Sequence, residues 1–320
     1  MKLLACVLSL FSFFAANAAA QDYPNRPIRV IVPYAAGGLP DTISRLVGQK
    51  MGDGLGQQMV VENRGGAGGI TGTTEVTKAS ADGYVLLVAD VGQIAINPHL
   101  FSKLPYDPLK DLVGVSLLGT SALYLVAHPS VGANNMQELI ALVKSQPGKL
   151  SYGSSGTGSI HHLATEALKV GLGLDILHVP YKGTGQSVPA LLGGQVGLLY
   201  AALPSIESHY KAGKVKILAV STPQRSPSTP EVPTVAESGV PGYDFVAEIA
   251  LYAPAGTPRD VIAKLAAQAA RAVKQPDVVE RFKQLGIDPV GSTPEHLGAM
   301  NRANYEKYAK VVKASGAKID

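Results

Sequence analysis

The feature that most constrains this chain is an alternation of short apolar runs with segments of helical periodicity, joined by brief glycine-rich turns. Residues 28–32 form a β-branched run typical of a buried parallel strand. Asp41 is the expected helix cap, and apolar residues at helical spacing follow over 43–51. Strand-like runs recur at 59–61 and 84–89. This βαβαβ pattern predicts a parallel sheet with right-handed crossovers.

The middle and end of the chain repeat the scheme and finish in helices. Because long linkers are scarce, we expect the chain to cross between two α/β lobes through strands, near Ser121 and near Ala250. The first lobe is then 22–121 plus 252–320 and the second is 122–251, each a mixed, mostly parallel sheet flanked by helices. Strands are expected at 124–127, 150–153, 176–179, 196–200, 215–220 and 247–253, and helices at 72–79, 135–143, 159–170, 261–273, 278–285 and 294–314.

The N-terminus has the three parts of a secretory signal peptide, assigned to 1–20. Lys2 supplies the positive start, 3–14 is almost wholly apolar, and 18–20 is a run of alanines suited to cleavage. A first core helix, or a lipid anchor at Cys6, is the alternative. Because Cys6 is the only cysteine, the exported chain has none, which excludes disulfides, thiolate catalysis and cysteine-based metal sites. We therefore expect a periplasmic protein.

Composition limits the classes of partner. Hydrophobic residues make up 46% and charged residues 16%, which favours a folded globular chain over a disordered one. The formal charge of +4 is spread over 28 basic and 24 acidic residues without a long basic run, so nucleic acid binding has little support. Beyond the signal peptide no long apolar stretch occurs, so we expect a soluble protein rather than a membrane-spanning one.

Two glycine-bearing turns between a strand and a helix are the candidate binding elements. In open α/β sheets, ligands lie at the carboxyl ends of strands, and a helix N-terminus with exposed amides suits an anion. The first turn contributes Tyr34, Ala36, Gly37, Gly38 and Asp41, and the second contributes Ser154, Ser155, Gly158 and Ser159. A carboxylate held between them would be bound from both lobes. The alternatives are a tight turn without a ligand and, in the second turn, simple N-capping by Thr157 or Ser159.

Other loops at strand ends add Gln93, in 90–94, and Ala201, in 200–203. His161 and His162 fall in the first turn of the helix after the second glycine turn, where histidine is more often a structural hydrogen-bonding residue than a ligand. No spacing of histidine with acidic residues fits a metal site, and we expect no metal and no cofactor.

The sequence does not match the enzyme motifs that were considered for its glycine- and serine-rich segments. Residues 153–156 miss the Gly-x-Ser-x-Gly elbow by one position, and no phosphate loop ends in Gly-Lys-Ser/Thr. The run 65–69 is glycine-rich but does not match the dinucleotide fingerprint, so a close turn is the better interpretation. The chain has no tryptophan and 6% aromatic residues, which disfavours a sugar-stacking site. We expect a binding protein that is not an enzyme.

Motifs along the whole chain after the signal peptide resemble those of the Bug-type receptors of the tripartite tricarboxylate transporter family. Each motif is weak alone, but so many in one order are specific. They include Tyr23-Pro24-Asn25-Arg26-Pro27-Ile28, Val32-Pro33-Tyr34-x-Ala36-Gly37-Gly38-x-x-Asp41, Val61-Glu62-Asn63-Arg64, Gly66-Ala67-Gly68-Gly69, Asp82-Gly83-Tyr84, Ile96-Asn97-Pro98, Leu104-Pro105-Tyr106-Asp107-Pro108, Val179-Pro180-Tyr181-Lys182-Gly183, Leu192-Gly193-Gly194-Gln195-Val196, Val232-Pro233-Thr234 and Ala253-Pro254-Ala255-Gly256-Thr257-Pro258.

This resemblance implies a type II-like, two-lobe periplasmic binding protein fold that closes on its ligand like a Venus flytrap. It implies that a small organic carboxylate (a dicarboxylate, a tricarboxylate, an aromatic acid or an amino acid) is held by residues 36–38 and by the second-lobe Ser/Gly turn, partly through water. Delivery would be to separate membrane subunits of the tripartite tricarboxylate type, from a monomeric receptor. The alternatives are a ligand sensor that feeds a signalling pathway and a hydrolase or lyase on the same scaffold.

Two departures from the family pattern bear on ligand choice. Where relatives often carry Asp-Asn, this chain has Ala201-Ala202, so an acidic group is missing there. Where an aromatic residue is common, this chain has Glu248. A carboxylate beside an anion pocket needs a partner, so we expect Glu248 to meet a ligand ammonium, a hydroxyl or a cation such as Lys182. The alternative is an exposed glutamate on a crossover strand.

Overall fold

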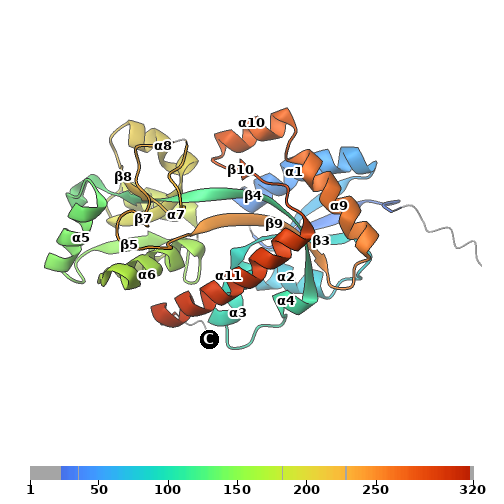
Figure 1. The fold of residues 1–320 in the computed structure, drawn as a ribbon, viewed down its shortest axis with the longest axis horizontal. Helices are drawn as coiled ribbons and strands as arrows, with labels where there is room; N and C mark the ends of the chain where they lie inside the picture. Colours follow the sequence, from blue (N-terminus) through green and yellow to red (C-terminus); the bar gives the residue numbers. More distant parts are fainter. Residues whose placement is uncertain (1–22, 35, 182, 228, 318–320) are drawn as a thin grey trace, which may run out of the picture.

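The computed structural model describes residues 23–34, 36–181, 183–227 and 229–317, and the predicted signal peptide at 1–20 lies outside them. The strands follow the order β2-β1-β3-β9-β4-β7-β5-β6, with β8 and β10 (Asp288–Pro289) also paired to β4. Helices cover this sheet in two groups, one around β1–β3 and one around β5–β8 (Figure 1). The expected α/β class with two lobes is confirmed.

In the first lobe, β1 (Ile28–Val32) lies between β2 (Met59–Asn63) and β3 (Val85–Asp90), and all three are parallel. The predicted βαβαβ unit is therefore present, because α1 (Leu39–Leu55) and α2 (Ile70–Thr77) join these strands. α9 (Arg259–Ala272) and α10 (Pro276–Gln284) return from the C-terminal part of the chain to cover the same lobe (Figure 1). Short helical segments occur at Ala67–Gly69, Gly92–Ile96, Asn97–Leu100 (α3) and Pro108–Asp111 (α4).

In the second lobe, β5 (Ser151–Ser154) pairs in parallel with β6 (Leu177–Pro180) and β7 (Leu198–Ala202). β7 and β8 (Lys216–Val220) each pair antiparallel with β4. The helices here are α5 (Met136–Ser145), α6 (Ile160–Leu172), α7 (Thr184–Leu192) and α8 (Leu203–Lys211), with a short turn of helix at Pro129–Val131. The sequence did not predict α7 or α8; α7 is short and contains Pro189.

The two lobes share the long strand β4 (Leu112–Ala127), which pairs with β9 (Val246–Pro254) up to Ala122 and with β7 from Leu123 onward (Figure 1). The sequence predicted only 124–127 as strand. Gly114 and Gly119 break the apolar run, and the register with β9 shifts beside each of them. A Cβ at either glycine would approach a side chain within 2.8 Å, so both mark close packing rather than a loop.

Strand direction brings the loops of both lobes to one place. β3 and β4 are both antiparallel to β9, so β1–β3 run in the direction of β4, toward the second lobe. β7 is antiparallel to β4, so β5–β7 run toward the first lobe. The carboxyl ends of both parallel sets therefore face the junction between the lobes, where ligands bind in sheets of this type.

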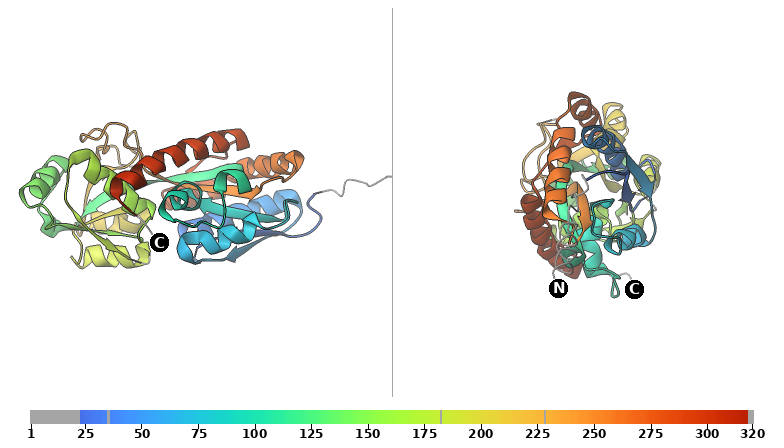
Figure 2. Two further views of the ribbon diagram at one scale, coloured as in Figure 1. Left: turned by 90° about the horizontal axis from the view of Figure 1, so that it is seen from below. Right: turned by 90° about the vertical axis from the view of Figure 1, so that its right-hand side faces the viewer.

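The C-terminal helix α11 (Pro294–Ser315) also connects the lobes, running from the first lobe to α6 along one side of the molecule (Figure 2). Its Tyr308 and Val312 belong to a buried cluster that includes Leu163 of α6 and Ile96 of the first lobe. The domain limits at 121/122 and 251/252 stay a prediction. No helix in the described part of the chain has the length and hydropathy needed to cross a bilayer.

Candidate functional site

The first glycine turn leads from β1 into α1 and is braced by Asp41. The helix begins at Leu39 with Gly38 as its N-cap, so the prediction that Asp41 caps it was wrong. Pro40 is suited to the first turn of the helix. The Asp41 side chain, one residue later, does not cap the helix but points back to the glycine turn that precedes it. Asp41 Oδ2 accepts a hydrogen bond from the Gly37 N–H at 2.8 Å, and Asp41 Oδ1 lies 2.9 Å from Arg45 Nη2.

This bracing decides which groups of the turn are free to bind a ligand. Burial raises the pKa of Asp41, but hydrogen bonds from Gly37 and its other donors outweigh it, and the pKa lies below its usual value. Asp41 is therefore a fixed negative charge that supports the turn. Ala36, Gly37 and Gly38 are exposed, and the Gly38 N–H donates to no acceptor among the described residues. That amide lies at the positive end of α1, where an anion is stabilised.

Tyr34 and Gln93 meet beneath this turn rather than on its surface. Gln93 is 1% exposed, and its Nε2 donates to Tyr34 Oη at 2.8 Å and to the Gly68 carbonyl at 3.0 Å. The Asp90 N–H donates to Gln93 Oε1 at 3.3 Å. Burial raises the pKa of Asp90, against opposing hydrogen bonds from Tyr34 and Gly92. Gln93, predicted as a ligand contact, is thus enclosed by protein partners.

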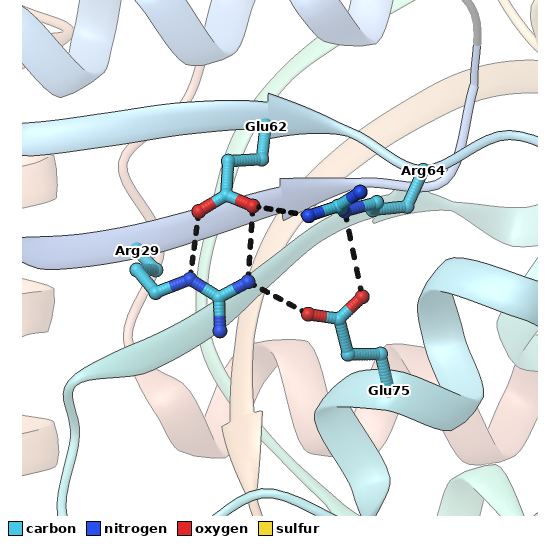
Figure 3. A network of polar contacts seen from close by, with 4 residues as sticks. All are labelled: Arg29, Glu62, Arg64 and Glu75. Carbon is cyan, nitrogen blue, oxygen red and sulfur yellow. Dashed lines mark hydrogen bonds and ion pairs between the residues drawn. The ribbon is translucent and has the colours of Figure 1, made fainter.

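An ion-pair network joins residues on either side of the neighbouring glycine turn, which supplies the Gly68 carbonyl (Figure 3). Arg29 on β1 makes a two-pronged contact with Glu62 on β2, at 2.7 and 3.0 Å. Glu75 on α2 and Arg64 after β2 complete the network. Hydrogen bonds from Arg29 and then Arg64 lower the pKa of Glu62 to about 2 against its burial. The close turn expected at 65–69 is confirmed by positive φ angles at three of its glycines.

The second glycine turn leads from β5 into α6, and histidines hold three of its groups. His178 Nε2 lies 2.7 Å from Ser154 Oγ, and His161 Nδ1 lies 2.7 Å from Ser155 Oγ. The Gly158 N–H donates to His162 Nδ1 at 3.1 Å. His161 and His162 thus make the expected hydrogen bonds within the turn, and that neither contacts a ligand stays a prediction.

Capping completes the second turn. Ser159 is the N-cap of α6 and accepts from the His162 N–H, as one of the two capping alternatives predicted. Ser154 is fully buried, and its Oγ also accepts from the Gly156 N–H at 3.1 Å. Thr157 is exposed at the tip. The sequence therefore located the turn, while the structure divides it into internally bonded groups and an exposed tip.

The remaining two predicted positions lie at the junction in different settings. Ala201 on β7 is completely buried in the second-lobe core. Glu248 on β9 faces Thr120 on β4 and is half-buried, and its Oε2 accepts from Asn304 Nδ2 at 2.6 Å. Burial raises the pKa of Glu248 to about 7, although Lys307 acts in the opposite direction. The partner found is therefore on α11, and Lys182 lies outside the described residues.

Two further observations concern places away from the junction. A hollow of about 620 Å³ lies between α1 and β2 and contains none of the predicted site residues; its lining includes Arg45, Gln49, Asp53 and Met59. Among the described residues, no group of three or more His, Cys, Asp or Glu side chains is arranged to hold a metal ion.

Comparison with known proteins gives one consistent result. Residues 43–317 match the model of the tripartite tricarboxylate transporter family receptor. The chain belongs to this receptor family. The match to Protein BugT from Bordetella pertussis (strain Tohama I) is 37% identical and covers 100% of this chain and 99% of that protein. Because that alignment spans the whole chain, it also includes the first glycine turn, which the family model does not reach.

Two solved structures resemble the receptor closely and were determined with a ligand. An R. palustris protein with adipate has a TM-score of 0.84 and 31% identity, covering 93% of this chain and 100% of that one. MatC from Rhodopseudomonas palustris with bound malate has a TM-score of 0.80 and 34% identity, covering 91% and 100%. The chain is therefore a solute-binding receptor with the periplasmic binding protein fold, and the family consists of receptors rather than enzymes.

Proposed function

We propose that this receptor captures a small organic carboxylate at the junction of its lobes and presents it to membrane subunits of the tripartite tricarboxylate type. The observation that carries the proposal is the convergence of strand ends. β1 and β5 run toward each other's lobe, and each ends in a glycine turn that opens a helix. Two helix N-termini and their amides therefore serve one negatively charged group.

Main-chain N–H groups suit this role because they donate hydrogen bonds without adding a counter-charge. On the first turn the exposed Gly38 amide supplies the donor, and on the second the exposed tip at Thr157 supplies it. A carboxylate that bridges the two turns favours the closed arrangement of the lobes, because only that arrangement offers both sets of donors.

A dicarboxylate of four to six carbons is the proposed ligand class, since similar structures hold malate and adipate. The signal-like sequence at 1–20 supports export of the receptor. We further propose that the receptor is monomeric and binds its solute without converting it. Incubating malate and adipate with the purified protein should leave both unchanged, as judged by mass spectrometry.

A pair of glycine substitutions tests the first turn. Gly37 and Gly213 both have positive φ, +86° and +67°, and a Cβ at either meets nothing within 4 Å. Alanine at either position introduces similar backbone strain of about 1 kcal/mol. Gly37→Ala should weaken dicarboxylate binding in calorimetry, and Gly213→Ala should leave it unchanged. Equal affinity of both variants and wild type would contradict the role of the first turn.

A further inference from the structure

Beneath the second glycine turn, aromatic rings form a partly buried stack that the proposed function does not use. His162 on α6 stacks on His178 on β6 with ring centroids 4.1 Å apart and planes 20° apart. Tyr152 on β5 stacks on His178 at 4.9 Å. His162 is 5% exposed. The stack fixes the orientation of the His162 ring, so the direction in which its Nδ1 points is not free to change.

The hydrogen bond between Gly158 and His162 defines a protonation state. Because the Gly158 N–H is the donor, His162 Nδ1 must carry a lone pair and no proton. If Nδ1 also carried a proton, two N–H donors, one from Gly158 and one from the ring, would face each other at this contact. Gly158 has a φ of +79° and is buried, so water cannot replace His162 as the acceptor for its amide. Loss of the Nδ1 acceptor therefore destabilises the conformation of the turn itself.

We propose that His162 is a positioning residue for carboxylate binding: its unprotonated Nδ1 holds the Gly158 amide, fixes the second turn in its ligand-receiving form, and makes binding weaken on acidification. This rests on the proposed function, since it assumes that the turn grips the ligand. His162 does not touch the ligand in this scheme. It acts through the turn, while the exposed tip at Thr157 makes the contact.

The groups around His162 determine the direction of the pH effect. Burial lowers its pKa, Glu166 acts against that and Lys169 adds to it. Tyr152 Oη donates to Glu166 Oε1 at 2.5 Å, and Lys169 Nζ lies 2.8 Å from the same oxygen, so that carboxylate is already paired.

Neighbouring segments complete the surroundings of α6. His178 stacks on the ring from β6, His161 is the next residue on α6, and Tyr308 of α11 lies in the adjoining cluster. Tyr243 donates to the Ala164 carbonyl on α6. The neutral state of His162 therefore persists to a pH below the ordinary histidine pKa, and binding weakens only on more acidic exposure.

Two substitutions at His162 distinguish loss of the Nδ1 acceptor from a change in side-chain size. His162→Asn keeps an acceptor oxygen at the δ position but cannot take up a proton near neutral pH. His162→Gln moves the amide to the ε position and removes the δ acceptor. His296→Asn is the control, because His296 is exposed on α11. Binding of malate and adipate should be measured by calorimetry from pH 8 to pH 5 with each variant, alongside the unfolding temperature.

The expected result has three parts. At pH 8, His162→Asn should bind within about threefold of wild type, and His162→Gln about tenfold or more weaker, as for loss of a buried hydrogen bond. On acidification wild type and His296→Asn should lose affinity, whereas His162→Asn should lose markedly less. Titration of the ligand affects all the variants equally, so the difference between their pH profiles reports on His162.

The outcomes separate the inference from the function on which it rests. Equal affinity of the Asn and Gln variants at pH 8, or the same pH profile for His162→Asn and wild type, would overturn the positioning role. Wild type that binds no carboxylate at any pH would instead overturn the proposed function. If His162→Asn does not fold, His162→Gln and His296→Asn at pH 8 still decide, because equal affinity of these two variants would contradict the inference.

Discussion

The two glycine turns occupy equivalent places in the two lobes, yet they are supported by opposite chemistry. In the first, the Asp41 carboxylate accepts from Gly37 and its pKa lies below the usual value. In the second, His162 accepts from Gly158, and burial lowers its pKa. On acidification the histidines gain charge while Asp41 is still ionised. The two turns are therefore expected to differ in acid sensitivity, according to the residue that accepts the hydrogen bond from the glycine amide.

The largest expected effect is from Gly156→Ala in the second turn. Gly156 has a φ of +127°, outside the left-handed region that other residues tolerate, and a Cβ there would lie 3.3 Å from the Tyr181 carbonyl. We expect a loss of about 1–3 kcal/mol in the free energy of unfolding, with a loss of ligand affinity, measured by urea unfolding and calorimetry. A variant as stable as Gly37→Ala would show that the second turn is not the more constrained of the two.

Next is the pH dependence of stability that the histidines impose. Burial lowers the pKa of both His161 and His178 from 6.5 to about 4. The unfolded chain therefore takes up protons first, so the stability from these groups is complete above pH 6.5 and is lost as the pH falls through about 4. Urea unfolding between pH 8 and pH 4 should show this decline, and a His161→Asn, His178→Asn double variant should show a smaller one. An equal decline in both would contradict it.

Asp41→Asn should give a smaller effect in the first turn. The amide oxygen still accepts from Gly37, but the charge that pairs with Arg45 is gone, so we expect a loss of about 1 kcal/mol at neutral pH. Since folding lowers the Asp41 pKa, the difference from wild type is full above pH 3.8 and shrinks on further acidification. Thermal unfolding at pH 7 and pH 3 measures this difference in stability. A difference that is larger at pH 3 than at pH 7 would contradict the lowered pKa of Asp41.

The last effect concerns Glu248, on β9 where it pairs with β4. Folding raises its pKa from 4.5 to about 7, so the stability it contributes is present below pH 4.5 and is lost as the pH rises through about 7. Glu248→Gln keeps an acceptor for Asn304 and should be more stable than wild type at pH 8, with no gain at pH 4. Thermal unfolding at both values provides the measurement. Lower stability at pH 8 would contradict it.

The same variant addresses ligand choice. If Glu248 meets a ligand ammonium, Glu248→Gln should weaken binding of amino-substituted dicarboxylates and leave malate and adipate unaffected. Equal losses for both classes in calorimetry would remove the ammonium interpretation and leave Asn304 as the partner that matters.

Sequence patterns located the fold and both turns because the strands and helices that flank them are local signals. They missed most of β4, since Gly114 and Gly119 interrupt its apolar run and their role depends on close packing with distant residues. The hydrogen-bond partners of Gln93, Tyr34 and Gly68, come from other elements and could not be found from local spacing, and its contact with a ligand stays a prediction. The role of His178 depends on β6 lying beside β5, which spacing alone does not show.

The most direct test is a crystal structure of the receptor with malate or adipate bound. The proposed function predicts one ligand carboxylate within hydrogen-bonding distance, about 2.7–3.2 Å, of main-chain N–H groups from both 36–38 and 155–157, directly or through one water. A well-ordered ligand that contacts only one of these turns, or neither, would contradict the claim that the two lobes share a single anion.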